Sequence, residues 1–399
     1  MGFTSIDYIV LSLYLAGVAY FGLRASGKQQ TADDYFLGGH QIPWWAVLFS
    51  IVATETSTLT FISIPAVSYG GNLTFLQITL GYLIGRILVA RYFLPKYFEG
   101  ELFTAYTFLE KRFGAGMRNA ASLTFIVTRV LADGVRLFAT AIPIAIILRM
   151  GGGFGWAGDL ELYLYSIILI AIITLIYTFF GGIKAVVWMD VVQMGVYIGG
   201  AMIALSVLFV HMADMAALPA EKLRIIDFGF GDSFGDFIRQ PYTFFTAVIG
   251  GAVFSLASHG TDQLLVQRVL VTRNLKDGQR AMILSGVVVM LQFALFLFIG
   301  LMLYRFYGGQ PATALGLSTN DEVFSRFIVE ELPAGISGLI IAALFAAAMS
   351  SLSSSLNSLA SSSTFDLLKP YLKKKNDPAF ELRLSRYSTL FWGLVLSGS

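Results

Sequence analysis

The sequence predicts an all-α protein that crosses a membrane many times, and its composition and hydropathy pattern carry this prediction. Only 13% of the 399 residues are charged and 56% are hydrophobic, whereas a soluble globular chain has about 25% charged residues. Windows of about 20 apolar residues, the length that a helix needs to cross the hydrocarbon core, follow one another along the chain. A soluble protein of this length would need more polar residues to cover its surface.

The same composition excludes several classes of protein. Disordered chains, collagen-like fibres and nucleic-acid binders do not combine such an apolar excess with a net charge of only +2. With no cysteine, the chain has no disulfides and no cysteine-bound metal. Its three histidines, His40, His211 and His259, argue against a histidine-bound metal or haem. There is no His-Glu-x-x-His motif and no aspartate pair in a Gly-x-Gly-Asp setting, so we expect no enzyme.

Ten apolar windows are predicted to span the membrane as helices. They cover residues 6–24, 42–69, 73–95, 119–148, 162–181, 185–211, 241–266, 279–306, 333–364 and a last one that starts near 387. The first window has no basic residue before it and no small-residue cleavage site after it, which predicts a permanent helix rather than a signal peptide. Because the chain ends inside the last window, we expect the sequence to be a truncated version of a longer protein.

The distribution of lysine and arginine predicts the orientation of the chain. With the N-terminus outside, the inside segments hold 17 of the 27 basic residues and the outside segments hold six. Cytoplasmic loops carry such an excess, so we expect the N-terminus outside. The expected location is the plasma membrane, specifically a bacterial inner membrane. The longest loops, 212–240 and 307–332, leave no room for an extramembrane domain. Residues 1–399 are therefore expected to form a single transmembrane domain.

Polar residues gather in the second window, where lipid-facing side chains would be apolar. Six of the eight residues from 53 to 60 are Thr, Ser or Glu, and Pro65 follows shortly after. This pattern predicts a break in the helix at mid-membrane, and broken helices hold cations and substrate groups in secondary transporters. The alternative is a continuous helix whose hydroxyls bond back to carbonyls one turn earlier, but that arrangement would leave Glu55 unsatisfied.

A second polar cluster is the serine-rich part of window 333–364. On a helix, Ala347, Ser350, Ser351 and Ser354 share one face, and Ser353 lies beside Ser350. Hydroxyl and carbonyl oxygens without a strong acid suit a weakly held monovalent cation such as Na⁺. Close packing of helices through small residues is the alternative.

Ionisable residues inside two further windows need an explanation as well. Arg129, Asp133 and Arg136 fall on one helix face, where Arg129 and Asp133 can pair. They form either a structural ion-pair cluster or part of a substrate cavity. Asp190, in the sixth window, is either an interfacial anchor or a cation ligand.

Four segments share their residue pattern with one family of membrane proteins. They are residues 31–39 (Thr-Ala-Asp-Asp-Tyr-Phe-Leu-Gly-Gly), 181–193, 260–268 and 346–351. Through them the chain resembles the sodium:solute symporter family, which includes sugar, sialic acid, proline, pantothenate and multivitamin transporters. The resemblance implies a leading helix, 6–24, and two five-helix inverted repeats (5+5) at 42–211 and 241–399, the second truncated in the ninth core helix. The broken and serine-rich helices would then face each other where the repeats meet.

The resemblance also implies sodium sites. The family's main sodium site, made of backbone carbonyls and two hydroxyls, maps onto Ala53, Thr56, Ala347, Ser350 and Ser351. A second site, present in some members only, maps onto Asp190, Ser350, Ser353 and Ser354. Whether one or two sodium ions bind per cycle stays open.

The implied substrate cavity maps onto eight further positions. They are Glu55, Ser57, Thr60, Phe75, Thr79, Arg129, Ser255 and Ser258. Glu55 replaces a small polar residue of sialic acid carriers, which argues against sialic acid as substrate. Sugar carriers have an acid where this chain has Thr79, and a tyrosine where it has Ser258. Glu55 together with an arginine suggests a polar or zwitterionic organic solute.

The function implied by the resemblance is sodium-coupled import of a small polar organic solute by alternating access. The expected partners are that solute, Na⁺ and the lipid bilayer, with no nucleic acid. A monomer is expected to suffice, although the oligomeric state stays open. Two other functions fit the sequence: a sodium symporter-like sensor domain of a signalling protein, or a passive channel whose flux needs no sodium gradient.

Overall fold

The fold is seen in a computed structural model that describes residues 4–25, 27, 29–100, 102–150, 158–211, 218–230, 233–240, 242–372 and 377–398. Within these ranges the chain is helical, and one isolated parallel bridge pairs Ile42 with Thr272. The predicted all-α fold is therefore confirmed. Residues 241 and 399, the expected limits of the second repeat, lie outside the described ranges, as do residue 1 and part of loop 212–240.

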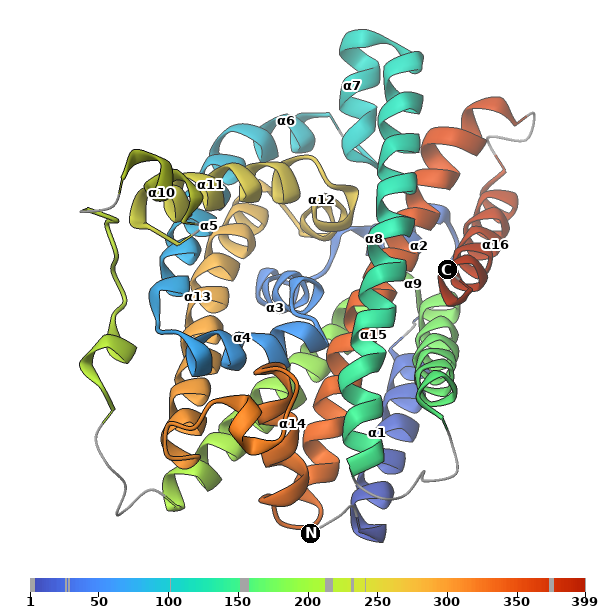
Figure 1. Ribbon diagram of the computed structural model, residues 1–399. Helices are drawn as coiled ribbons and strands as arrows, with labels where there is room; N and C mark the ends of the chain where they lie inside the picture. The colour runs from blue at the N-terminus through green and yellow to red at the C-terminus, as the bar shows by residue number, and fades with distance from the viewer. Residues whose placement is uncertain are drawn as a thin grey trace.

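The helices pack side by side, with α14 near the N-terminus at one end of the bundle and α7 at the other (Figure 1). The first half contains α1 (Ser5–Arg24), α2 (Ala32–Phe36), α3 (Trp44–Glu55), α4 (Thr58–Gly70), α5 (Gln77–Leu88), α6 (Leu94–Glu99), α7 (Ala105–Phe113), α8 (Ala115–Met150) and α9 (Asp159–Val210). The second half contains α10 (Phe234–Arg239), α11 (Phe244–Gly260), α12 (Gln263–Leu270), α13 (Leu275–Phe306), α14 (Asp321–Glu330), α15 (Ile336–Ser362) and α16 (Pro378–Ser397).

Several of these helices can cross a membrane. In the described residues, seven helical runs are long and apolar enough to do so, and the bent pair α3–α4 makes an eighth if it counts as one span. The number of predicted windows, ten, is larger than this count. One reason is that windows 162–181 and 185–211 both lie in the single helix α9. The last window lies in α16, which starts at Pro378 and is not among the seven. The chain is a multi-pass membrane protein.

A sharp turn at Gly182 divides α9 into residues 159–181 and 183–210. Gly182 has φ 57° and ψ −157°, a backbone conformation that suits glycine alone. A Cβ at this position would lie 2.5 Å from the carbonyl oxygen of Tyr35. Tyr35 is fully buried, and its hydroxyl donates a hydrogen bond to the Thr178 carbonyl at 3.1 Å. The separation of the two predicted windows therefore depends on this glycine.

Replacing Gly182 with alanine is expected to lower the free energy of unfolding by about 1–3 kcal/mol, because alanine would be held in a rarely populated backbone region. Thermal unfolding of the purified protein in detergent measures the loss. Gly199→Ala in the same helix is the matched control, since a Cβ there would meet no atom within 4 Å. Equal losses in the two variants would contradict the special role of Gly182.

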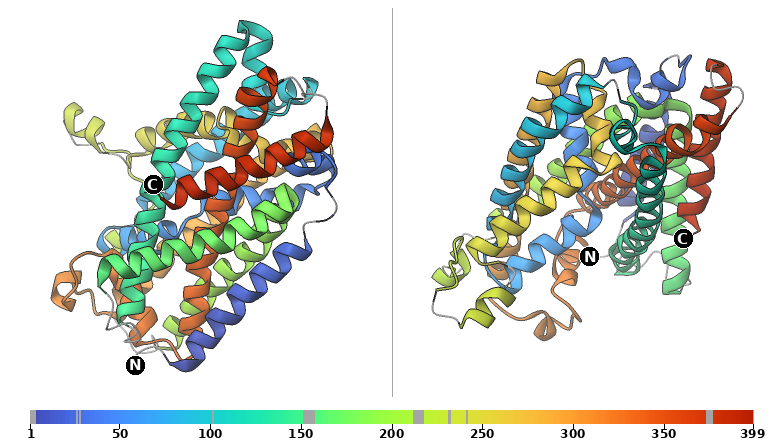
Figure 2. Two further views of the ribbon diagram at one scale, coloured as in Figure 1. Left: turned by 90° about the vertical axis from the view of Figure 1, so that its right-hand side faces the viewer. Right: turned by 90° about the horizontal axis from the view of Figure 1, so that it is seen from above.

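The interior of the bundle is built around α15. This helix packs against α1, α3, α8 and α9 and runs through the middle of the molecule (Figure 2). All its residues from Ile340 to Ser362 are buried. Its alanines and serines let neighbouring helices approach closely. The serine hydroxyls are thereby kept from lipid, so they need partners inside the protein.

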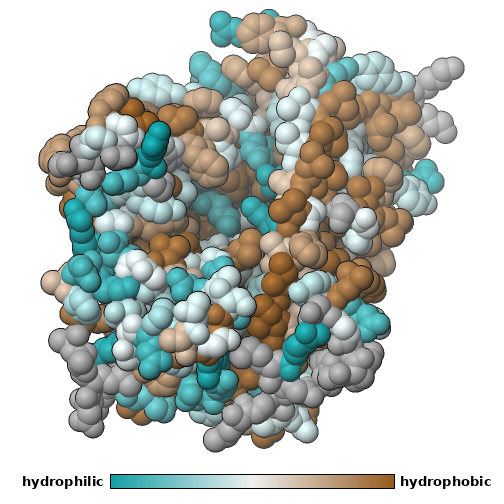
Figure 3. Space-filling view, in the orientation of Figure 1, coloured by the Kyte–Doolittle hydropathy of each residue, from teal (hydrophilic) through white to brown (hydrophobic). Residues whose placement is uncertain are grey.

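The lateral surface is largely hydrophobic, as contact with hydrocarbon requires. Figure 3 shows hydrophobic side chains along α8, where Leu131 and Val135 are 67% and 71% exposed. The same face is hollowed in its middle, next to α8, and hydrophilic side chains lie in the hollow (Figure 3). On this face, the apolar surface along α8 therefore borders a hollow that contains hydrophilic side chains (Figure 3).

Candidate functional site

The predicted break in the second window is confirmed. Helix α3 ends at Glu55 and α4 starts at Thr58, with a bend of 68° between them. Ser57 caps α4: its hydroxyl accepts from the Thr60 amide at 3.4 Å, and the Thr60 hydroxyl accepts from the Ser57 amide at 3.3 Å. Pro65 lies inside α4 and does not interrupt it. The break therefore comes from the capping residues rather than from the proline.

The serine-rich face of α15 lies directly against this break. The Ser350 hydroxyl donates to the carbonyl oxygens of Ala53 at 2.9 Å and of Ala347 at 3.1 Å. The Ser351 hydroxyl donates to the carbonyl oxygen of Thr56 at 3.3 Å. The structure thus brings together all five residues that the resemblance implied for the main sodium site.

The chemistry of these five residues suits a monovalent cation. The carbonyls of Ala53 and Thr56 lie at the C-terminal end of α3, where carbonyls have no partner within the helix. With the Ala347 carbonyl and the hydroxyls of Ser350 and Ser351, they form a set of neutral oxygens, all from residues at most 5% exposed. Hard, uncharged oxygen ligands are those that an alkali cation accepts.

Asp190, implied for the second sodium site, is fully buried, so the interpretation as an interfacial anchor is wrong. Its Oδ2 accepts a hydrogen bond from the Ser50 hydroxyl at 2.5 Å and lies 3.4 Å from Nη2 of Arg268. The same Arg268 nitrogen donates to the Ser354 hydroxyl. The hydroxyls of Ser353 and Ser354 donate to the Ser350 carbonyl at 3.0 and 2.6 Å.

Arg268 therefore contacts two residues of the implied second sodium site, Asp190 and Ser354. The sequence did not identify Arg268 as a site residue. It lies on α12 and is fully buried. Its only signal was its position at the end of segment 260–268, one of the segments that carry the family resemblance. Burial of an arginine without its acid is costly, so Arg268 and Asp190 depend on each other.

Glu55 is held by two side chains that the sequence did not assign to a site. Its Oε1 lies 2.7 Å from Nε2 of His259 on α11, and its Oε2 pairs with Arg86 on α5. Arg86 also donates to the Ser285 hydroxyl at 2.5 Å. Both oxygens of Glu55 are thus occupied. The arginine that accompanies Glu55 is Arg86 rather than Arg129.

Ser255 and Ser258, implied for the substrate cavity, lie around the same histidine. The Ser258 hydroxyl is 2.9 Å from Nδ1 of His259, and that of Ser255 is 3.4 Å from it. The Ser255 hydroxyl also donates to the Tyr82 carbonyl at 3.1 Å. Three of the implied residues, Glu55, Ser255 and Ser258, therefore meet in one cluster around His259, in which Ser255 is buried and the other two are half-buried.

The remaining implied cavity residues lie elsewhere. Arg129 pairs with Asp133 at 3.5 Å, as predicted, and with Asp262 at 3.2 Å. The ring of Phe75 contacts those of Tyr242 and Phe293. The Thr79 hydroxyl donates to the Leu76 carbonyl in its own turn. Among the described residues, hydrogen bonds and ion pairs do not join these three to Glu55.

A second helix break appears in window 241–266, which was predicted to be continuous. Helix α11 ends at Gly260 and α12 starts at Gln263, with Asp262 capping α12 through a hydrogen bond of 2.8 Å from the Leu264 amide. The capping aspartate after Gly260 was the available signal. The ends of α3 and α11 face each other, because Glu55 and His259 lie at them.

Comparison with known proteins supports a transport role. The profile of the Sodium:solute symporter family matches residues 35–396. The sodium/sialic acid symporter NanT of Aliivibrio fischeri is 31% identical over 396 residues, which are 98% of this chain and 75% of that protein. The sodium/sialic acid symporter SiaT of Proteus mirabilis is 31% identical over 400 residues, which are 99% of this chain and 77% of that protein.

A solved structure gives the same result. It is the substrate-bound, outward-open state of a Na⁺-coupled sialic acid symporter with a novel Na⁺ site, and its TM-score is 0.81. Its sequence is 30% identical to this one, and the match covers 99% of this chain and 80% of the symporter chain. These relatives are transporters rather than enzymes, and Na⁺ is the coupling ion. The chain belongs to the sodium:solute symporter family.

Proposed function

We propose that this chain imports a small polar organic solute together with Na⁺ by alternating access. The observation that carries the proposal is the contact between α15 and the broken helix, where Ser350 and Ser351 donate to the carbonyls of Ala53 and Thr56. The excess of basic residues in the segments predicted inside supports an N-terminus outside, and we propose a bacterial inner membrane as the location.

Two features support a leading helix followed by 5+5 inverted repeats. The pair α3–α4 opens the first expected repeat and α11–α12 opens the second, and each is interrupted between its two helices. The expected third helices of the repeats, α8 and α15, pack against each other. Residues 42–211 are then the first repeat, and the second runs from about residue 241 into the ninth core helix, α16.

Bound sodium would bridge oxygen atoms of the broken helix and of α15. When it binds, the hydroxyl hydrogens of Ser350 and Ser351 turn away, and their oxygens join the carbonyls of Ala53, Thr56 and Ala347 around the ion. This clamp favours the state in which the solute cavity is formed. Coupling needs only that sodium and solute favour the same state, and release follows inside, where sodium is scarce.

A second sodium ion would use Asp190, Ser350, Ser353 and Ser354. In the present arrangement Arg268 neutralises Asp190 and occupies the Ser354 hydroxyl. The second site therefore needs Arg268 to give up the Ser354 hydroxyl, so we propose the main site as the one that is formed first.

The solute cavity is proposed to use the residues implied by the resemblance. They are Glu55, Ser57, Thr60, Phe75, Thr79, Arg129, Ser255 and Ser258. The polar side chains near both helix breaks favour a polar solute, zwitterions included, since they can exchange hydrogen bonds with its groups. Glu55 is already paired with Arg86 and His259, so the solute would meet a neutral, hydrogen-bonding cluster rather than a free carboxylate.

A thermal-shift screen followed by uptake measurements tests this function. Purified protein is heated with candidate solutes, sialic acid among them, in NaCl or in KCl. A solute that stabilises only in sodium is expected, and the same solute should accumulate in proteoliposomes against its gradient only when sodium is higher outside. Sodium-independent, purely downhill flux would instead indicate a channel. Solute binding without any flux would indicate a sensor.

A further inference from the structure

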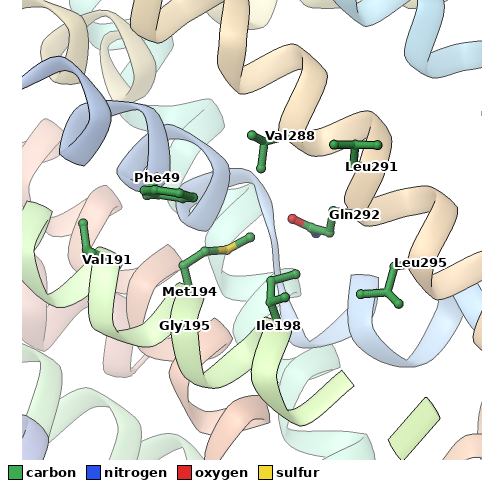
Figure 4. Close-up of a pocket in the computed structure, with 9 residues that line it drawn as sticks. All are labelled: Phe49, Val191, Met194, Gly195, Ile198, Val288, Leu291, Gln292 and Leu295. Carbon is green, nitrogen blue, oxygen red and sulfur yellow. The ribbon is translucent and has the colours of Figure 1, made fainter. Parts of the chain in front are cut away.

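Two different surroundings border the proposed main sodium site. Between α3, α9 and α13, a groove of about 490 Å³ lies beside the helix break (Figure 4). Its lining is apolar except for Gln292, whose amide exchanges two hydrogen bonds with the Thr56 hydroxyl. A cation needs oxygen ligands, so an ion that leaves the main site would not move into this groove.

Helix α15 offers the other surrounding, a row of buried hydroxyls. Ser355 and Ser362 follow Ser351 of the main site by four and eleven residues, positions that share one face of a helix. All three residues are at most 5% exposed. The Ser355 hydroxyl is buried without a hydrogen-bond partner in the described part of the chain, and such a group marks a place for a water molecule or an ion.

The row ends at Asp366, in the π-helical turn η6 (Ser363–Leu368) that continues α15. Oδ1 of Asp366 accepts a hydrogen bond from the Thr104 hydroxyl at 2.6 Å, and Oδ2 accepts one from the Ser362 hydroxyl at 2.9 Å. The Ser122 hydroxyl of α8 lies 2.7 Å from that of Ser362. All four residues are fully buried. One acid among hydroxyl oxygens suits a monovalent cation better than a divalent one.

The charge of the Asp366 carboxylate has no cation of its own. Asp366 makes no ion pair among the described residues, and Arg118, which acts on it from a longer distance, pairs with Glu110 at 2.6 Å. Lys369, three residues further along the chain, pairs with Glu381 at 2.9 Å. Arg118, Glu110 and Asp366 together leave one negative charge in excess. A buried charge of this kind has to be neutralised.

We propose that Asp366, Thr104, Ser122 and Ser362 form a further Na⁺ site, which the ion occupies after it leaves the main site. Asp366 lies about 22 Å from Ser351 along the helix. Thr104 caps α7, at the end of the bundle opposite to the N-terminus (Figure 1), so with the N-terminus outside the ion would be released from here to the inside. The role in release rests on the proposed function, whereas the binding of the ion does not.

Equilibrium binding of radioactive Na⁺ to the purified protein in detergent, without solute, counts the bound ions and gives their affinities. Asp366→Asn removes the charge but keeps the size of the side chain. Ser362→Ala removes one ligand oxygen. Ser361→Ala is its matched control, because Ser361 is equally buried but its hydroxyl accepts from the Gln263 amide at 3.5 Å.

Asp366→Asn is expected to bind one ion fewer than wild type. Ser362→Ala should bind the same ion about ten-fold more weakly, and Ser361→Ala should bind like wild type. The double variant Ser350→Ala and Ser351→Ala should keep the ion at Asp366, so that loss of this ion identifies Asp366 even if the main site is assigned wrongly. If Asp366→Asn does not fold, the comparison of Ser362→Ala with Ser361→Ala decides alone.

An unchanged ion count in Asp366→Asn, or equal affinities in Ser362→Ala and Ser361→Ala, would overturn the proposal, and Asp366 would then be neutralised by a proton. That result would leave the proposed function intact as long as wild type binds Na⁺ through Ser350 and Ser351. Absence of Na⁺ binding from wild type would overturn both.

Discussion

Arg268→Met is expected to lower the free energy of unfolding by about 3–5 kcal/mol, the cost of leaving a buried charge without its partner. Arg268 and Asp190 are both fully buried, and Nη2 of Arg268 lies 3.4 Å from Oδ2 of Asp190. Arg268 also donates to the Ser50 hydroxyl at 3.0 Å and to the Leu264 carbonyl at 3.1 Å. Methionine fills much of the same volume but replaces none of these bonds.

A double-mutant cycle separates the ion pair from general damage to packing. The combined variant Asp190→Asn and Arg268→Met removes both charges, so it should lose much less stability than the two single losses added together. Thermal unfolding in detergent without sodium gives all three values. Arg280→Met is the control, because the Arg280 side chain is 64% exposed and should change stability by less than about 0.5 kcal/mol. Additive single losses would refute the coupling.

Ser350→Ala and Ser351→Ala are each expected to raise the Na⁺ concentration for half-maximal uptake about ten-fold. Each change removes one hydroxyl oxygen that would be a ligand of the ion in the proposed main site. Losing a partner of this kind costs about 1–3 kcal/mol, and about 1.4 kcal/mol corresponds to a ten-fold change in affinity. A sodium titration of solute uptake in proteoliposomes measures the effect, and uptake at a fixed low sodium concentration should fall in parallel.

Ser358→Ala is the matched control for these two variants. Ser358 lies on the same helix and is equally buried, but its hydroxyl donates to the Ser355 carbonyl within α15 at 3.1 Å. Its replacement should leave the sodium dependence unchanged. If Ser350→Ala and Ser351→Ala both transported with wild-type sodium dependence, the assignment of the main sodium site would be wrong.

Local chemistry predicted the features that depend on one segment alone. The polar run at 53–60 indicated the break that forms after Glu55, and helical spacing placed Ser350 and Ser351 on one face of α15. The ion pair of Arg129 with Asp133 followed from a spacing of four residues on a helix. Each of these features is decided within one or two helical turns, so the order of residues is sufficient to show it.

Partners that come from distant segments could not be predicted in this way. Arg86 and His259 lie 31 and 204 residues from Glu55, and Arg268 lies 78 residues from Asp190. A single sequence shows that a buried charge needs a partner, but it does not show which of several candidates will be adjacent. Glu55 was accordingly matched with Arg129, which instead pairs with Asp133 and Asp262.

The sequence by itself determined that this protein is a helical membrane protein, where one helix breaks and which serines share a face, because these depend on hydropathy and spacing along the chain. Only the tertiary structure decided that Ser350 and Ser351 meet the carbonyls of that break, that Arg86 and His259 hold Glu55, and that Arg268 pairs with Asp190. Those contacts are decided by how the helices pack, since packing brings together groups that the chain keeps far apart and the low-polarity interior makes their pairing obligatory.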